Sequence, residues 1–252
     1  MKQLKKSGEF GHRAYSLLTG LGRHELSVLL CVLVVSGGIW GFVALADEVF
    51  EGDTQSIDEA ILLALRNPAD HADPLGPGWV EELGRDFTAL GGVGVLMLIT
   101  LGGLGFLLLA RRFRAALFTT VAVPGGVITS MLMKAGFDRP RPDLVPHESI
   151  VYTASFPSGH AMMSAVTYLT LAALLSRMQS QLRLKAYLLL MAILLTLLVG
   201  SSRVYLGVHW PSDVIAGWAA GSAWAALCWL VMRWLQQRGQ VEAEQPDSTQ
   251  VD

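Results

Sequence analysis

Long apolar stretches separated by short charged segments dominate the chain. Six such stretches are typical of membrane-spanning helices: 26–46, 87–110, 115–133, 161–176, 186–202 and 214–232. A helix needs about 20 mostly apolar residues to cross the hydrocarbon layer, and the fourth and fifth stretches reach this length if 156–160 and 203–205 form end turns. The pattern predicts an all-α, polytopic membrane protein with six transmembrane helices.

Composition supports a membrane protein and excludes other classes. Hydrophobic residues make up 52% of the 252 residues and charged residues 16%, whereas soluble domains carry about 25% charged residues. The net charge is -2 and no basic run is present, so nucleic acid is not an expected partner. The two cysteines, Cys31 and Cys228, lie inside apolar stretches, which leaves neither a disulfide framework nor a cysteine-based metal site.

The basic residues predict the orientation of the chain. Most of the 19 lysines and arginines lie before the first stretch or after the second, fourth and sixth stretches. Because basic residues in short loops remain on the cytoplasmic side, we expect both termini to be cytoplasmic. Residues 1–25 form a basic lead-in, 26–235 the membrane domain, and 236–252 a polar tail expected to be disordered.

The first outer loop, 47–86, is strongly acidic. Within it Ile57, Ile61, Leu62 and Leu65 recur at helical spacing. This spacing favours a short amphipathic, interfacial helix on the outer surface, and the alternative is a solvated loop with one or two helical turns. The many glycines of the second stretch, between residues 91 and 105, suggest close helix packing.

Polar residues of specific types collect at the ends of the later stretches. Directly after the third stretch come Lys134 and, further on, Arg141. Directly before the fourth stretch come Ser158, Gly159 and His160. Between the fifth and sixth stretches lie Arg203, His209 and Asp213. The six-span topology places all three groups on the outer side. Ionisable residues at such positions are costly and mark function.

The cations suggest that this outer site binds phosphate. Lys134, Arg141 and Arg203 around a small site match a phosphate group, whose oxygens suit the forked guanidinium of arginine. Ser158 is a plausible N-cap of the fourth span, and Gly159 lets the backbone approach a ligand. Free N–H groups at a helix start also bind anions.

The two histidines add the groups that phosphoryl transfer requires. One imidazole can attack phosphorus while the other protonates the departing oxygen. Asp213 follows His209 by four residues, and with Pro211 at the first helical position it could hold the ring of His209 in the attacking tautomer. His160, without an acidic neighbour in sequence, is the better acid.

These motifs resemble the type 2 phosphatidic acid phosphatase superfamily, which shares its site with vanadium haloperoxidases. The signature runs from Lys134 to Arg141-Pro142, through Pro157-Ser158-Gly159-His160, to Ser202-Arg203, His209 and Asp213. The resemblance implies that His209 is the nucleophile, Asp213 its orienting partner and His160 the general acid. It also implies phosphate binding by Lys134, Arg141, Ser158, Gly159 and Arg203, with no metal and no cofactor.

The resemblance to compact bacterial lipid phosphatases implies a substrate class and a location. We expect hydrolysis of a lipid phosphate or lipid diphosphate. The candidate substrates are of the undecaprenyl diphosphate, phosphatidylglycerophosphate or phosphatidic acid type. The expected location of the site is the periplasmic or extracellular side of a bacterial inner (plasma) membrane. The expected partners are this substrate and membrane lipids, and the oligomeric state is open. Alternatives are a lipid phosphotransferase of the same family and a non-enzymatic six-span transporter; a haloperoxidase is disfavoured because those relatives are soluble.

Overall fold

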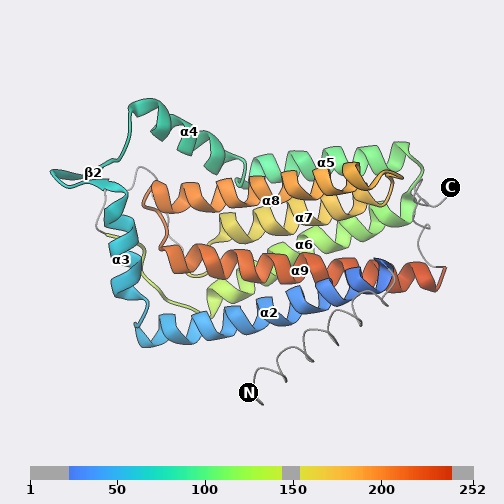
Figure 1. The fold of residues 1–252 in the computed structure, drawn as a ribbon, viewed down its shortest axis with the longest axis horizontal. Helices are drawn as coiled ribbons and strands as arrows, with labels where there is room; N and C mark the ends of the chain where they lie inside the picture. The colour runs from blue at the N-terminus through green and yellow to red at the C-terminus, as the bar shows by residue number, and fades with distance from the viewer. Residues whose placement is uncertain (1–22, 144–153, 240–252) are drawn as a thin grey trace, which may run out of the picture.

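The computed structural model describes residues 23–143 and 154–239, and the chain in these ranges is mostly helical (Figure 1). Most of the predicted basic lead-in and of the predicted disordered tail lies outside the described residues. The elements in chain order are α2 (Arg23–Glu51), α3 (Gln55–Ala64), β1 (Arg66–Asn67), β2 (Asp70–Pro74), α4 (Gly78–Ala89), α5 (Val93–Leu109), α6 (Phe113–Ala135), α7 (Gly159–Ser176), α8 (Leu182–Tyr205) and α9 (Pro211–Gln237).

The helices confirm an all-α membrane protein with six spans. Among the described residues, five helices are individually long and apolar enough to cross a membrane: α2, α6, α7, α8 and α9. Helices α4 and α5 meet the same criterion only as a pair, bent by 53° at a short break, which brings the candidate spans among the described residues to as many as six. The predicted single span 87–110 is therefore wrong in detail, because Gly92 adopts an extended conformation with φ -71° and ψ 147° and starts a new helix at Val93.

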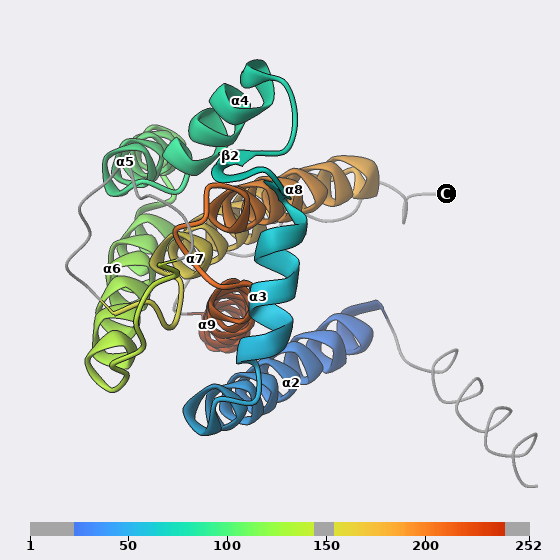
Figure 2. The same cartoon turned by 90° about the vertical axis from the view of Figure 1, so that its left-hand side faces the viewer.

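Helix α7 lies at the centre of the bundle, between α8 and α9 (Figure 2). Glycines allow α9 to approach it closely: a Cβ at Gly217 would lie 2.7 Å from the carbonyl oxygen of Ser158, and one at Gly221 would lie 2.6 Å from that of Met162. Small residues four apart provide the close contact that stabilises helix pairs in lipid. This contact joins the start of α7 to the second and third turns of α9, directly below the helix ends that carry predicted site residues.

The glycines of the second span play a smaller part than predicted. A Cβ at Gly103 would lie 3.0 Å from the side chain of Leu171, so this glycine does lie at a close helix contact. Gly94, Gly102 and Gly105 have no neighbour within 4 Å of such a Cβ. Close packing therefore explains only some of these residues.

The first outer loop contains the short helix that the apolar spacing favoured. Helix α3 crosses the end of α9 (Figure 2) and buries Leu62 completely. Ile57 and Ile61 are 64% and 43% exposed, so the apolar side chains of α3 are divided between the protein and its surroundings. The antiparallel strands β1 and β2 and the helix α4, which were not predicted, complete the loop.

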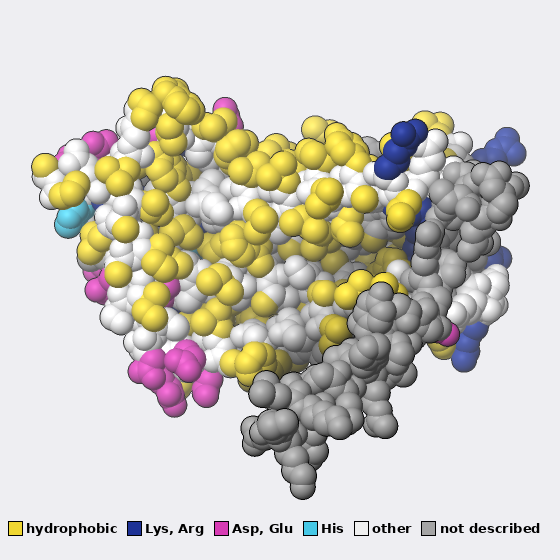
Figure 3. Space-filling view, in the orientation of Figure 1, with side chains coloured by type: hydrophobic (Ala, Val, Ile, Leu, Met, Phe, Trp, Pro, Cys, Tyr) yellow, Lys and Arg dark blue, Asp and Glu magenta, His cyan; other side chains and the backbone are white. Residues whose placement is uncertain are grey.

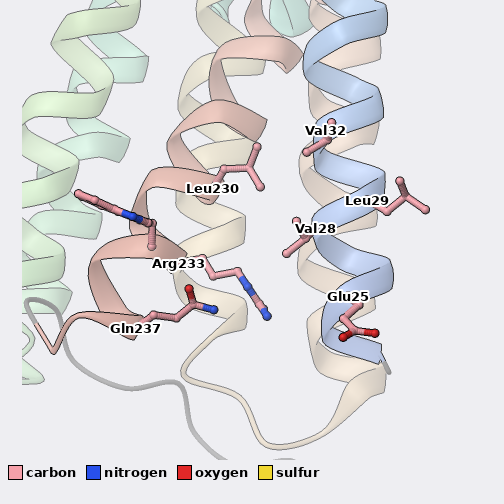
Figure 4. A pocket seen from close by; sticks show the side chains of 8 residues that line it. Glu25, Val28, Leu29, Val32, Leu230, Arg233 and Gln237 are labelled. Atoms are coloured by element: carbon pink, nitrogen blue, oxygen red, sulfur yellow. The ribbon is translucent and has the colours of Figure 1, made fainter. Parts of the chain in front are cut away.

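Charge is distributed unevenly along the molecule. Acidic side chains gather at the end that carries α3 and β2, basic side chains at the opposite end, and hydrophobic side chains cover the face between them (Figure 3). At the basic end a groove between α2 and α9 is lined by Glu25, Val28, Leu230 and Arg233 among others (Figure 4). None of the eight predicted site residues lines this groove.

Candidate active site

All eight predicted site residues lie at helix ends or in the segments directly beside them, and Figure 1 shows these helix ends on the side of the molecule that carries α3 and β2. They occupy the last turn of α6, the segment after it, the start of α7, the last turn of α8, and the junction of α8 and α9. In chain order they are Lys134, Arg141, Ser158, Gly159, His160, Arg203, His209 and Asp213. Three predicted motifs that are far apart in sequence therefore meet at one end of the bundle.

The ring of His209 lies between a carboxylate and a guanidinium. Its Nδ1 is 3.2 Å from Oδ2 of Asp213, and its Nε2 is 3.2 Å from Nη1 of Arg141. Arginine can only donate hydrogen bonds, so Nε2 must accept and the proton of a neutral ring resides on Nδ1, facing Asp213. This tautomer places the lone pair of the ring on Nε2, where in this structure it accepts the hydrogen bond from Arg141.

Asp213 is held in place by the turn that starts α9. Pro211 occupies the first helical position, where its missing N–H costs no hydrogen bond. Asp213 Oδ2 accepts a 3.0 Å hydrogen bond from the backbone N–H of Trp210 and a further one from Ser155 Oγ. The carboxylate is completely buried, so these donors replace the water that it loses.

Burial determines the charge of the histidine. His209 is 1% exposed, and this desolvation lowers its pKa to about 4, although Asp213 acts in the opposite direction. The positive charges of Arg141 and Arg203 lower this pKa further. Burial also lowers the pKa of Arg141, while a guanidinium stays protonated in proteins at pH 7. His209 is therefore neutral and Arg141 charged at pH 7.

The three predicted cations are fixed by oxygens of the surrounding backbone and side chains. Lys134 Nζ donates to the carbonyl of Ala154 at 3.2 Å, and Arg141 Nη1 to that of Val208 at 2.8 Å. Among the described residues, neither Lys134 nor Arg203 pairs with a carboxylate. Their positive charge remains available for an anion.

The Pro-Ser-Gly-His segment differs from the prediction in one respect. Ser158 occupies the N-cap position of α7, but its side chain makes no capping hydrogen bond. Its Oγ, like Nε of Arg203, is buried and has no hydrogen-bond partner among the described residues. Gly159 makes room for Lys134, since a Cβ there would lie 3.3 Å from Cε of that lysine.

His160 lies in the first turn of α7, beside the break between α4 and α5. A Cβ at Gly91 would lie 3.2 Å from Cδ2 of His160 and 2.4 Å from Val199. The charges of Arg203, Lys134 and Arg141 act on His160, as does the ring of His209. His209 lies at the same end of the bundle, in the junction between α8 and α9.

Sequence reasoning missed four residues that support this site. Thr88 accepts a 2.9 Å hydrogen bond from Arg203. Two further residues contact Asp213, Arg139 through an ion pair and Ser155 through a hydrogen bond. Asp58 in turn forms an ion pair with Arg139. Arg139 lies inside the first motif, between Lys134 and Arg141, at a position that the signature does not specify. Asp58 shares a helix face with Leu62 and Leu65, at spacings of four and seven residues, which is the pattern that could have separated it from the other acids of its loop.

Within the described ranges, no three or more His, Cys, Asp or Glu side chains are grouped in a way that could hold a metal ion. The expectation of a metal-independent site stays a prediction, which chelation can test.

Fold and site together define a multi-pass membrane protein with a histidine–aspartate pair in a cationic site. The chain belongs to the PAP2 superfamily, whose family model matches residues 104–237. This match covers the recognised motifs and confirms the resemblance found in the sequence.

Curated relatives and a solved structure agree with this assignment. Phosphatidylglycerophosphatase B of Bacillus subtilis strain 168 is 34% identical over 187 residues, 71% of this chain and 85% of that protein. Lipid A 1-phosphatase of Rhizobium etli is 31% identical over 62% of this chain and 72% of its own length. An undecaprenyl-diphosphatase of Sulfolobus acidocaldarius is 43% identical over 68 residues, 27% of this chain and 29% of its own length.

The fold is similar to a solved structure, the crystal structure of a transmembrane PAP2-type phosphatidylglycerolphosphate phosphatase from Bacillus subtilis. The two chains superimpose with a TM-score of 0.67 and are 26% identical, and the match covers 82% of this chain and 97% of that one. The similarity to a solved membrane phosphatase thus extends over most of the fold.

Proposed function

We propose that this protein is a phosphatase that removes phosphate from a lipid phosphate or lipid diphosphate. The observation that carries the proposal is the position of His209, which faces Asp213 with Nδ1 and Arg141 with Nε2 at one end of a membrane-spanning bundle. The names of the relatives, which are all lipid phosphatases, support the same reaction class.

The proposed reaction passes through a phosphohistidine. Nε2 of His209 attacks phosphorus, a bond forms between nitrogen and phosphorus, and the bond from phosphorus to the lipid oxygen breaks. His160, in its protonated form, gives a proton to that oxygen. Water then attacks the phosphohistidine, returns a proton to His160 and releases inorganic phosphate.

The cations and Asp213 stabilise charge during this transfer. Lys134, Arg141 and Arg203 bind the phosphoryl oxygens as negative charge develops on them. Nε of Arg203 and Oγ of Ser158 are buried groups that a phosphate can satisfy, and leaving such groups unpaired is costly. Asp213 stabilises the ring of His209 when it carries the phosphoryl group.

The charge distribution supports an outward-facing site. Basic side chains gather at the end opposite the site (Figure 3), and basic residues of short loops remain cytoplasmic. We place the site on the periplasmic or extracellular side of a bacterial inner (plasma) membrane, with both termini cytoplasmic. A phosphate held at this level suits an amphiphile whose tail stays in the lipid.

Phosphate release by the purified full chain in detergent tests the proposal. The substrate panel is undecaprenyl diphosphate, phosphatidylglycerophosphate, phosphatidic acid and lipid A 1-phosphate. We expect release from at least one substrate, and its loss by at least a thousandfold in His209→Ala. His71→Ala, an exposed histidine of β2, is the matched control and should keep full activity.

Two results would contradict the proposal. The first is no phosphate release from any member of the panel by folded protein, and the second is undiminished release by His209→Ala. With a labelled donor, hydrolysis gives free phosphate, whereas transfer gives a labelled lipid or sugar. The same assay therefore separates a phosphatase from a phosphotransferase.

A further inference from the structure

Arg139 connects two buried carboxylates from distant parts of the chain. Its Nη1 lies 2.7 Å from Oδ1 of Asp213, at the start of α9, and its Nη2 lies 2.7 Å from Oδ2 of Asp58, in α3. Asp213 is 0% exposed and Asp58 2% exposed. Burying charged groups costs desolvation free energy, so these buried ion pairs indicate a role other than keeping the protein soluble.

Asp58 also fixes the helix turn that carries Asp213. Its Oδ1 accepts a 2.9 Å hydrogen bond from the backbone N–H of Ser212, and its Oδ2 accepts one from the hydroxyl of Ser212. Arg139 Nη1 donates to the same hydroxyl at 2.7 Å. The first turn of α9 is thereby attached to both α3 and the segment that follows α6.

The two oxygens of Asp213 face different partners. Oδ1 faces Arg139, while Oδ2 faces Nδ1 of His209, Ser155 and the backbone of Trp210. An arginine that paired with Asp213 alone would offset the negative charge that His209 experiences. In the observed arrangement Asp58 shares that arginine, and the trio of Asp58, Arg139 and Asp213 keeps a net charge of one negative unit.

We propose that Asp58 and Arg139 are positioning residues for His209 that act through Asp213. Arg139 fixes the orientation of the Asp213 carboxylate, and Asp58 offsets the positive charge that Arg139 brings. The trio thus holds the carboxylate still and leaves it negative enough to stabilise the phosphorylated ring. This role rests on the proposed function of His209 as the nucleophile.

Other charged and titratable groups also face His209 and have to be kept constant in a test. They are Arg141 from the segment after α6, Arg203 from α8 and His160 from α7, and Lys134 from the last turn of α6 acts in turn on His160. Substitutions in Asp58 and Arg139 leave all of them in place. A change in the titration of His209 therefore reports on the trio.

The test is the titration of His209 in histidine-labelled full-length protein, followed by NMR in detergent. The chain has six histidines, and the signal of His209 is assigned by its absence in His209→Gln. Arg139→Gln removes a positive charge and should move the midpoint up by about one pH unit; Asp58→Asn removes a negative charge and should move it down. The double variant keeps the net charge of the trio, so its midpoint should return toward that of the wild type.

Matched variants separate this electrostatic role from a purely structural role of the same residues. Asp53→Asn, an exposed acid of the same loop, and Arg85→Gln, in the ion pairs of α4, should leave the midpoint unchanged. Arg139→Lys and Asp58→Glu keep the charges and should retain the wild-type midpoint even if they loosen the geometry. If one of the single variants Arg139→Gln and Asp58→Asn fails to fold, the other is compared with the double variant, whose midpoint should lie closer to that of the wild type; equal midpoints in the two would overturn the proposal.

Activity gives a second readout. We expect kcat for the best lipid phosphate to fall at least tenfold in Arg139→Gln, with KM changed less than kcat, because neither residue is placed to touch the substrate. Shifts of the His209 midpoint in the same direction for both single variants, or no shift in either, would overturn the proposal. A wild-type protein that releases no phosphate would contradict the proposed function instead, while the NMR titration would still decide the role of the trio.

Discussion

Arg203, in the last turn of α8, donates a 2.9 Å hydrogen bond to the hydroxyl of Thr88, in the last turn of α4. This contact joins the bent second span to a predicted phosphate ligand. It fixes one nitrogen of the guanidinium, while Nε remains without a partner among the described residues. The bend between α4 and α5 is therefore part of the support of the site.

The first prediction concerns this hydrogen bond. Thr88→Val keeps the side-chain shape and removes the acceptor, so Arg203 loses a contact worth about 1.5 to 3 kcal/mol. We expect kcat/KM for a lipid phosphate to fall by roughly 10-fold or more. Thr100→Val is the control, because the Thr100 hydroxyl bonds only within α5, to Leu96 at 2.7 Å. Equal effects of the two substitutions would argue against a role for Thr88 in the site.

A second prediction concerns the glycine at the bend. A methyl group at Gly91 would lie 2.4 Å from Val199 and 3.2 Å from His160, so Gly91→Ala has to displace one or both. We expect a loss of about 1 to 3 kcal/mol in unfolding free energy from overpacking, together with reduced kcat. Gly94→Ala, with nothing within 4 Å, is the control and should behave like the wild type. Thermal unfolding and steady-state rates in detergent measure both effects.

Parts of the fold and site followed from the sequence because they depend on local pattern. The apolar stretches give six spans, and the spacing from His209 to Asp213 places a carboxylate one helical turn from the imidazole. The break at Gly92 was missed because an apolar run looks the same whether the helix is straight or bent. The support of Arg203 by Thr88 was missed for a different reason, since the two residues are 115 positions apart.

The acidic residues of the first outer loop are another case in which the sequence alone does not identify the important residue. The first outer loop is rich in acids, and composition alone treats them as a solvated set. Asp58 differs from its neighbours because α3 packs against α9 and buries this one carboxylate against Arg139. Only tertiary packing decides which of several similar carboxylates is buried and paired.

The third prediction is a pH dependence. Burial holds the pKa of His209 near 4, below the value of about 6.5 for an exposed histidine, so the ring is neutral and nucleophilic above that pH. We expect kcat/KM to fall on the acid side as pH decreases through about 4, while loss of the proton from His160 sets a separate limit on the alkaline side. The free energy of unfolding changes in the same direction. The histidine of the unfolded chain binds a proton at a higher pH than buried His209, so the stability that neutral His209 contributes is lost as pH falls from about 6.5 to about 4. Circular dichroism at each pH separates loss of activity from unfolding, and an acid limb near pH 6.5 would contradict the assignment.

The fourth prediction concerns metal dependence and transition-state mimicry. The proposed reaction uses protein groups alone, so dialysis against EDTA should leave the rate unchanged. Vanadate can adopt the five-coordinate geometry of a transferring phosphoryl group, and we expect it to inhibit competitively. Loss of activity on chelation, restored by a divalent metal, would contradict the metal-independent mechanism. His209→Ala offers a control for vanadate, because it should bind the inhibitor much more weakly.

The final prediction separates the roles of the two histidines by the leaving group. If His160 gives a proton to the departing oxygen, His160→Ala should slow an alkyl lipid phosphate by roughly 100-fold or more. An aryl phosphate with an acidic phenol leaves without that proton, so its first step should be slowed much less. His209→Ala should abolish both reactions, because it removes the nucleophile. A burst of phenol release in His160→Ala measures the first step directly, and equal slowing of the two substrates would assign His160 to phosphate binding instead of acid catalysis.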